Sequence, residues 1–230
     1  MKVCTDACLF GAIAASYFVA NTQPLHVLDI GTGTGLLSLM FAQKNNEALI
    51  DAVEIDEAAA AQANENFTAS PWKERLILHH TSIQQFTTPN QPINQSTNQL
   101  YDLILSNPPF FEGDLKSPDD SRNTALHSSE LSFEELLSSI QKLLKPSGVF
   151  GVLLPYHRAS YFIELAIAAG FYLSKNISVK QTTKHVFFRS ILFFSDASAA
   201  AVEEVLSIKD EANNYTAEFV ALLKDYYLYL

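Results

Sequence analysis

The chain has 230 residues, of which 48% are hydrophobic and 17% charged, and its formal net charge is −10 at pH 7. This composition supports one large domain, residues 1–230, with a sizeable core, and it argues against a highly charged disordered chain. No uninterrupted apolar run reaches membrane-spanning length, and an acidic chain that bound nucleic acid would need a local basic surface.

Residues 1–24 are expected to form an entry segment that closes over the site described next. Within it, residues 7–20 are predicted to form an apolar core helix with Thr5 or Asp6 as N-cap. The apolar part lacks a convincing cleavage region, so we expect no signal peptide. Cys4 and Cys8 are too few for a disulfide scaffold and have no metal-ligand cluster beside them. We therefore expect a cytoplasmic protein with reduced cysteines and no metal.

A glycine-rich turn is the most informative stretch of the sequence. Residues 25–30 are typical of a buried parallel strand, and residues 36–42 are predicted to form a helix. Glycines stand at every second position between them: Gly31, Gly33 and Gly35. Glycine lets the backbone turn tightly and approach a ligand, and a helix start offers N–H groups to an anionic ligand end. With Asp29, the pattern Asp-x-Gly-x-Gly-x-Gly resembles motif I of the S-adenosylmethionine (SAM) methyltransferases.

A carboxylate follows at the end of the second predicted strand, residues 48–55. There Glu54, with Ile55 beside it, can accept hydrogen bonds from both ribose hydroxyls of a nucleoside cofactor. Asp56 is expected to cap the helix predicted over residues 57–67.

The third predicted strand, residues 76–79, leads to Ser82 and Ile83, where many SAM enzymes carry an acid for the adenine amino group. His79 and His80 lack the surrounding ligands of a metal site. Residues 87–99 are rich in Asn, Gln, Thr and Pro and are predicted to form a flexible surface loop.

A second motif follows the fourth predicted strand, residues 101–106. It reads Asn107-Pro108-Pro109-Phe110-Phe111. The Asn107 side-chain oxygen and the Pro108 carbonyl can accept the two N–H groups of an exocyclic amine, and the prolines hold these acceptors rigidly. Phe110 can stack on a flat base. The motif is therefore suited to methyl transfer onto the amino group of a planar substrate.

The second half of the chain continues the alternation of helices and strands. We predict helices over residues 131–144, 161–169 and 217–230, and strands over residues 149–154, 171–180 and 185–195, the last two as an antiparallel pair. The predicted fold is thus α/β: one doubly wound, mostly parallel, Rossmann-like sheet of seven strands, with a C-terminal hairpin and helix in residues 171–230.

Taken together, these motifs resemble the bacterial tRNA(Val) adenine N6-methyltransferases, which modify adenine 37 beside the anticodon. The opening Met-Lys-Val-Cys-Thr-Asp, the motif I stretch and the Asn-Pro-Pro-Phe motif carry the likeness over nearly the whole chain. The resemblance implies SAM as cofactor, with the glycines flanking it, Glu54 at its ribose, Thr5 and Asp6 near its methionine end, and Ser82 and Ile83 near its adenine. It also implies that Asn107, Pro108 and Phe110 hold the target adenine. Ser82 departs from the family pattern, in which this position usually holds Asp.

Basic residues suggest how so acidic a chain could hold an anticodon loop. No acid lies between Glu164 and Asp196 in the sequence. We predict a basic rim, with Phe111 near it, formed by Lys116, Arg122, Lys180, Lys184 and Arg189. The alternative is that these are merely solvated residues at strand ends.

Two other functions share the same motifs. A protein methyltransferase can use the same chemistry on a glutamine side-chain amide, although such enzymes usually carry an N-terminal helical domain. A SAM-binding module without catalysis is the third possibility, and the intact Asn-Pro-Pro-Phe motif argues against it.

Overall fold

The computed structural model describes residues 4–17, 24–87, 100–108 and 131–230. The expectations for Phe110, Phe111, Lys116, Arg122 and residues 88–99 lie outside these ranges.

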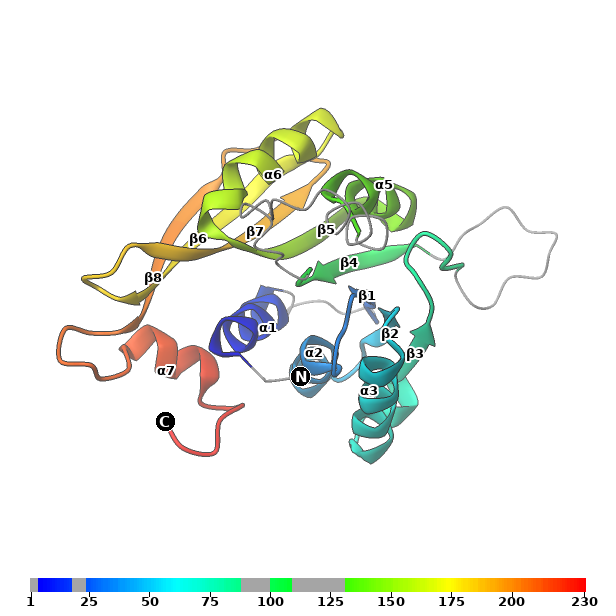
Figure 1. Cartoon of the computed structure of the whole chain (residues 1–230), viewed down its shortest axis with the longest axis horizontal. Helices are drawn as coiled ribbons and strands as arrows, with labels where there is room; N and C mark the ends of the chain where they lie inside the picture. The colour runs from blue at the N-terminus through cyan, green and yellow to red at the C-terminus, as the bar shows by residue number, and fades with distance from the viewer. Residues whose placement is uncertain (1–3, 18–23, 88–99, 109–130) are drawn as a thin grey trace, which may run out of the picture.

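A single sheet runs through the molecule (Figure 1). Its eight strands lie in the order β3-β2-β1-β4-β5-β7-β6-β8. In chain order they are β1 (His26–Ile30), β2 (Leu49–Glu54), β3 (Leu76–His80), β4 (Tyr101–Ser106), β5 (Leu144–Pro155), β6 (Tyr172–Thr182), β7 (Phe187–Ser195) and β8 (Val202–Lys209). Strands β1 to β5 pair in parallel, β7 is antiparallel to both β5 and β6, and β8 is parallel to β6. The mostly parallel α/β fold and the final antiparallel pair are therefore confirmed.

The sheet has one strand more than the seven predicted. Strand β8 is an edge strand, and its first half, from Val202 to Val205, is exposed. It therefore lacks the buried apolar run by which a central strand is found in a sequence. Its pairing with β6, for example Val179 with Leu206, becomes visible only in the folded chain.

Helices cover both faces of the sheet (Figure 1). Their bounds are α1 (Thr5–Tyr17), α2 (Leu36–Lys44), α3 (Glu57–Ala69), α5 (Phe133–Leu143), α6 (Tyr156–Ala168) and α7 (Ala217–Leu223). One core cluster joins α1, α2 and α7 to one face, and the other joins α5 and α6 to the opposite face. Among the described residues, no helix combines the length and apolar character needed to cross a membrane.

Some predicted helix ends differ in the structure. Helix α1 already begins at Thr5, so Thr5 and Asp6 form its first turn and neither is the N-cap. The Asp6 carboxylate accepts from the Ala7 N–H at 3.0 Å and from Arg189 Nε at 2.7 Å. Helix α6 begins at Tyr156, five positions before the predicted residue 161. The expected cap of α3 is confirmed, because Asp56 accepts from the Ala59 N–H at 2.8 Å.

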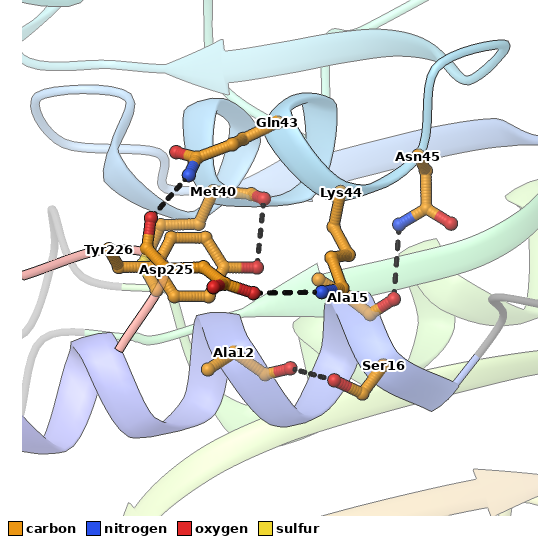
Figure 2. Close-up of polar contacts among 9 residues, drawn as sticks. All are labelled: Ala12, Ala15, Ser16, Met40, Gln43, Lys44, Asn45, Asp225 and Tyr226. Carbon is orange, nitrogen blue, oxygen red and sulfur yellow. Dashed lines mark hydrogen bonds and ion pairs between the residues drawn. The ribbon is translucent and has the colours of Figure 1, made fainter. Parts of the chain in front are cut away.

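Helix α7 ends at Leu223 instead of continuing to residue 230, because the chain turns there and packs against α2. The Tyr226 and Tyr227 N–H groups both donate to the Leu223 carbonyl. Figure 2 shows the result: Lys44 Nζ lies 3.0 Å from Asp225 Oδ2, and Gln43 Nε2 donates to the Asp225 carbonyl at 2.6 Å. These contacts fix the C-terminal segment against the C-terminal end of α2.

Candidate active site

The sheet topology brings the two sequence motifs together. Strands β1 and β4 are parallel neighbours, and the strand order reverses between them. Ligands of open α/β sheets bind at the carboxyl ends of the strands at such a reversal. Here the glycine turn follows β1 and Asn107 follows β4, and the Ser106 hydroxyl donates to the Ile30 carbonyl at 3.0 Å. The two motifs thus lie side by side at one edge of the sheet.

The glycines of the turn share a positive φ but differ in the space around them. All three adopt positive φ: 70° at Gly31, 59° at Gly33 and 83° at Gly35. A Cβ built on Gly31 would meet nothing within 4 Å, so a ligand can approach the backbone there. A Cβ on Gly35 would lie 2.4 Å from Phe67 Cε1, so this glycine serves the packing of α3. Gly31 therefore has open space beside it, and its contact with the cofactor stays a prediction.

Asp29 joins the glycine turn to the start of α2 by hydrogen bonds to its carboxylate. Its carboxylate is fully buried, and its Oδ2 accepts from Thr32 Oγ1 at 2.6 Å and from Ser38 Oγ at 2.7 Å. Burial raises the pKa of Asp29, although these hydroxyls oppose the shift. Thr32 and Ser38 carry little signal in the sequence, apart from a serine within the otherwise apolar residues 36–42. Direct contact of Asp29 with the cofactor stays a prediction, and its Oδ1 has no hydrogen-bond partner among the described residues.

Glu54 joins the end of β2 to the glycine turn. Its Oε2 accepts from the Gly33 N–H at 2.8 Å, and its Oε1 accepts from the Ile55 and Asp56 N–H groups, each at 2.9 Å. A carboxylate has about four acceptor positions, so one position on Oε2 is left for a further donor. The predicted bond to ribose would use this position.

Asn107 presents an unused acceptor at the same edge. Its Oδ1 is buried and has no hydrogen-bond partner among the residues that the structure describes. Because buried polar atoms are normally paired, an orphaned acceptor at a strand end needs an explanation. A substrate N–H group would supply the missing donor. Pro108, buried next to it, restricts the backbone of Asn107 to extended conformations.

The residues predicted near the adenine of the cofactor, Ser82 and Ile83, and Ile55 beside Glu54 differ in burial. Ser82 is half-buried beyond the end of β3, and the nearby Thr81 N–H donates to the Glu54 carbonyl at 3.0 Å. Ile83 is buried in a core cluster, whereas Ile55 is 63% exposed. Ser82 and Ile55 are therefore accessible to solvent at the carboxyl edge of the sheet, whereas Ile83 packs in the core beneath that edge.

The basic residues of the predicted rim have partners that the sequence did not reveal. Lys184 Nζ lies 3.2 Å from Glu211 Oε2, and Arg189 Nε lies 2.7 Å from Asp6 Oδ2. Lys180 Nζ lies 4.7 Å from the centre of the Phe187 ring. Residues 165–195 contain no acid, but in the folded chain acids from α1 and from the segment after β8 contact two of their basic side chains. The rim stays a prediction.

Comparisons with known proteins identify the family. Residues 12–149 match the methyltransferase small domain family. The tRNA1(Val) (adenine(37)-N6)-methyltransferase of Dyadobacter fermentans is 43% identical, covering 99% of this chain and 91% of its own length. The protein of the same name from Pseudoalteromonas translucida is 41% identical, covering 99% and 92%. The chain belongs to this methyltransferase family.

The structural comparison agrees with this family at the level of the fold. A predicted O-methyltransferase from Agrobacterium tumefaciens superimposes with a TM-score of 0.67 at 13% identity, covering 95% of each chain. The family uses SAM as methyl donor, and the residues here fit it: Gly31 leaves the turn open, Glu54 keeps an acceptor position, and α2 begins beside the turn. Within the described ranges, no group of three or more His, Cys, Asp or Glu side chains is placed to hold a metal ion.

Proposed function

We propose that this methyltransferase acts on the exocyclic N6 of an adenine in tRNA, namely adenine 37 of tRNA(Val), and that it does so in the cytoplasm. The observation that carries the proposal is the buried Asn107 Oδ1, which follows β4 beside the glycine turn and has no hydrogen-bond partner in the described part of the chain. The names of the relatives that align over nearly the whole chain support the same substrate.

The chemistry explains why an acceptor is needed. The lone pair of an adenine amino group is delocalised into the ring, so the nitrogen is a weak nucleophile. Bound SAM supplies an electrophilic methyl group on a sulfonium. Asn107 Oδ1 and the Pro108 carbonyl accept the two N–H groups, which orients the amine and favours tetrahedral geometry at nitrogen. The proton can leave to water afterwards, so no titratable base is required.

The residues around the turn have separate roles in this proposal. Gly31 lets SAM approach the backbone, and Oε2 of Glu54 accepts from the ribose. Asp29 holds the turn through Thr32 and Ser38. Thr5 and Asp6, in the first turn of α1, are proposed to close over the methionine end.

Replacing Asn107 tests the proposal. We expect Asn107→Ala to lower kcat on tRNA(Val) transcripts by at least about 100-fold, the scale for losing one preorganised polar group, while SAM affinity stays within about threefold. Methyl transfer is measured with labelled SAM, and SAM binding by calorimetry. Asn64→Ala, an exposed change on α3, is the matched control and should behave as wild type.

The substrate is tested with the wild-type enzyme. A tRNA(Val) transcript with guanine at position 37 should accept no methyl group. Transfer to that transcript, or to glutamine amides of proteins in place of tRNA, would contradict the proposal. Near-normal turnover by Asn107→Ala would refute the role of the orphaned oxygen.

A further inference from the structure

Two aromatic rings and a lysine form a cluster at the same edge of the sheet as the active site. Tyr156 and Phe187 have ring centroids 4.9 Å apart, with an interplanar angle of 35°. Lys180 Nζ lies 4.7 Å from the centre of the Phe187 ring. Tyr156 is 42% exposed, and Phe187 and Lys180 are half-buried. We call these three residues the aromatic platform.

The topology places the platform at the carboxyl edge. Tyr156 directly follows β5, which is the parallel neighbour of β4, the strand that Asn107 follows. Because β7 is antiparallel to β5 and to β6, Phe187 at the start of β7 and Lys180 near the end of β6 reach this same edge, where the two residues pair. Pro155 pairs with Arg189, which fixes the start of α6 beside the start of β7. The platform, on β5, β7 and β6, therefore lies at the same sheet edge as the predicted methylation site after β4, and these four strands are consecutive in the sheet.

Among the residues that the structure describes, no core packing explains the position of the platform. Tyr156 and Phe187 belong to neither of the two core clusters, nor to the residues packed against them. A tyrosine left 42% exposed at a strand end gains little from burial. A partly exposed ring pair next to a cation is instead an arrangement on which single-stranded bases can stack, because every base offers a π-face and the cation can meet a phosphate.

Charge favours a polyanion at this position. Lys180 forms no ion pair with any other residue that the structure describes, whereas the nearby Lys184 is paired with Glu211. Tyr156 thus offers exposed aromatic surface, and Lys180, beside Phe187, offers a positive charge. A single-stranded anticodon loop offers unstacked bases and phosphates together.

We propose that the aromatic platform binds an unstacked base of the anticodon loop that flanks the target adenine, with Lys180 meeting the adjoining phosphate. This inference rests on the proposed tRNA substrate and adds a specificity site to it. Holding a neighbouring base on the platform would keep the loop open while the target adenine is turned toward Asn107.

The experiment compares tRNA binding by wild-type protein and by variants of the platform. Tyr156→Ala and Phe187→Ala should each weaken binding of an anticodon stem-loop by about 5- to 100-fold, the range for loss of one base–aromatic stack, with unchanged SAM affinity. Phe187→Trp should retain binding. Tyr172→Ala is the matched control, because Tyr172 is 43% exposed at the opposite end of β6, and it should bind as wild type.

A spectroscopic readout separates stacking from a general loss of structure. With 2-aminopurine at the position next to adenine 37, binding of wild type should change the fluorescence, and the change should be absent with Phe187→Ala at saturating protein. Lys180→Ala should lower the slope of log affinity against log salt by about one, whereas the aromatic variants leave the slope unchanged.

The outcomes distinguish the platform from the proposed function. If wild type neither binds nor methylates tRNA(Val), the proposed function fails and the platform with it. If wild type is active and Tyr156→Ala, Phe187→Ala and the Tyr172→Ala control bind equally well, the function stands and the platform is refuted.

Discussion

Asp29 and Glu54 are two buried carboxylates at one sheet edge, and their surroundings give them different tasks. Glu54 accepts three backbone N–H bonds, which compensate the loss of water around a charged group. Asp29 accepts two hydroxyl bonds on one oxygen, its second oxygen has no partner within the described ranges, and burial raises its pKa. Glu54 thus fixes the backbone between the glycine turn and the end of β2, whereas Asp29 holds the turn from the core.

We expect Glu54→Ala to weaken SAM binding by at least about tenfold. The change removes the acceptor for ribose and releases the Gly33 N–H, and charge-assisted hydrogen bonds contribute about 1.5–3 kcal/mol. Calorimetry measures the SAM affinity. Asp56→Ala, which removes the cap of α3 and costs about 1 kcal/mol of stability, is the control and should leave SAM affinity unchanged. Equal SAM affinity of Glu54→Ala and wild type would rule out this role.

At the scale of elements, the first turn of α1 is held by strand β7. The Asp6–Arg189 contact of 2.7 Å joins residues at opposite ends of the sequence, with side-chain exposures of 12% and 27%. Arg189 also donates to the Phe188 carbonyl at 3.1 Å, which restricts its guanidinium. Asp6 is predicted to lie near the cofactor and Arg189 near RNA, so their ion pair links the two predicted sites through β7 and α1.

A double-mutant cycle with Asp6→Ala and Arg189→Ala should give a coupling of about 1–2 kcal/mol in the free energy of unfolding. This is the lower part of the range for charge-assisted bonds, because the pair is only partly buried. Urea denaturation measures it, and the exposed Lys184–Glu211 pair should show no measurable coupling. We also expect Arg189→Ala to weaken SAM binding. A smaller salt slope for tRNA with unchanged SAM affinity would instead support direct contact of Arg189 with RNA.

At the scale of the whole molecule, a buried polar network spans four strands of the sheet. Asp51 on β2 accepts from the Tyr101 hydroxyl of β4 at 2.9 Å, across the intervening β1. His79 Nε2 of β3 lies 2.6 Å from the other oxygen of Asp51. A network of this kind specifies which strands meet, because a shifted register would leave a buried carboxylate unpaired.

Tyr101 makes the stability of the fold sensitive to alkaline pH. Burial raises the pKa of Tyr101, and the charge of Asp51 adds to the shift. Above about pH 10 the unfolded chain loses this proton while the folded chain keeps it, so stability falls by about 1.4 kcal/mol per pH unit from this group. Burial raises the pKa of Tyr226 and of Tyr227 to about 12, which adds a loss of the same sign.

Urea denaturation from about pH 9 to about pH 11, a range that brackets the ordinary tyrosine pKa, measures how the free energy of unfolding depends on pH. Tyr101→Phe should be less stable than wild type at pH 8 and should show a shallower fall above pH 10. Tyr229→Phe, a change at a side chain that is 91% exposed, should keep the wild-type slope. An unchanged slope in Tyr101→Phe would show that Tyr101 ionises equally in the folded and unfolded chain.

The sequence by itself determined the local parts of this protein. Periodicity and glycine spacing predicted the parallel strands and the turn after β1, because a buried strand and a positive-φ turn each restrict the residues they can contain. The motif at Asn107 was predictable for the same reason: proline restricts its neighbours whatever the rest of the chain does. The resemblance carried by these motifs also predicted the family.

Only the tertiary structure decided which distant residues meet. The edge strand β8, the Asp6–Arg189 pair and the neutralisation of Lys184 by Glu211 leave no local pattern, because each depends on segments that are far apart in the sequence. The same is true of Tyr156 and Phe187, which form a platform only because β5 and β7 end and begin at one edge. A backbone constraint acts within a few residues, so it can be predicted from the sequence. Charge pairing and stacking act between distant segments, so they depend on the order of the strands.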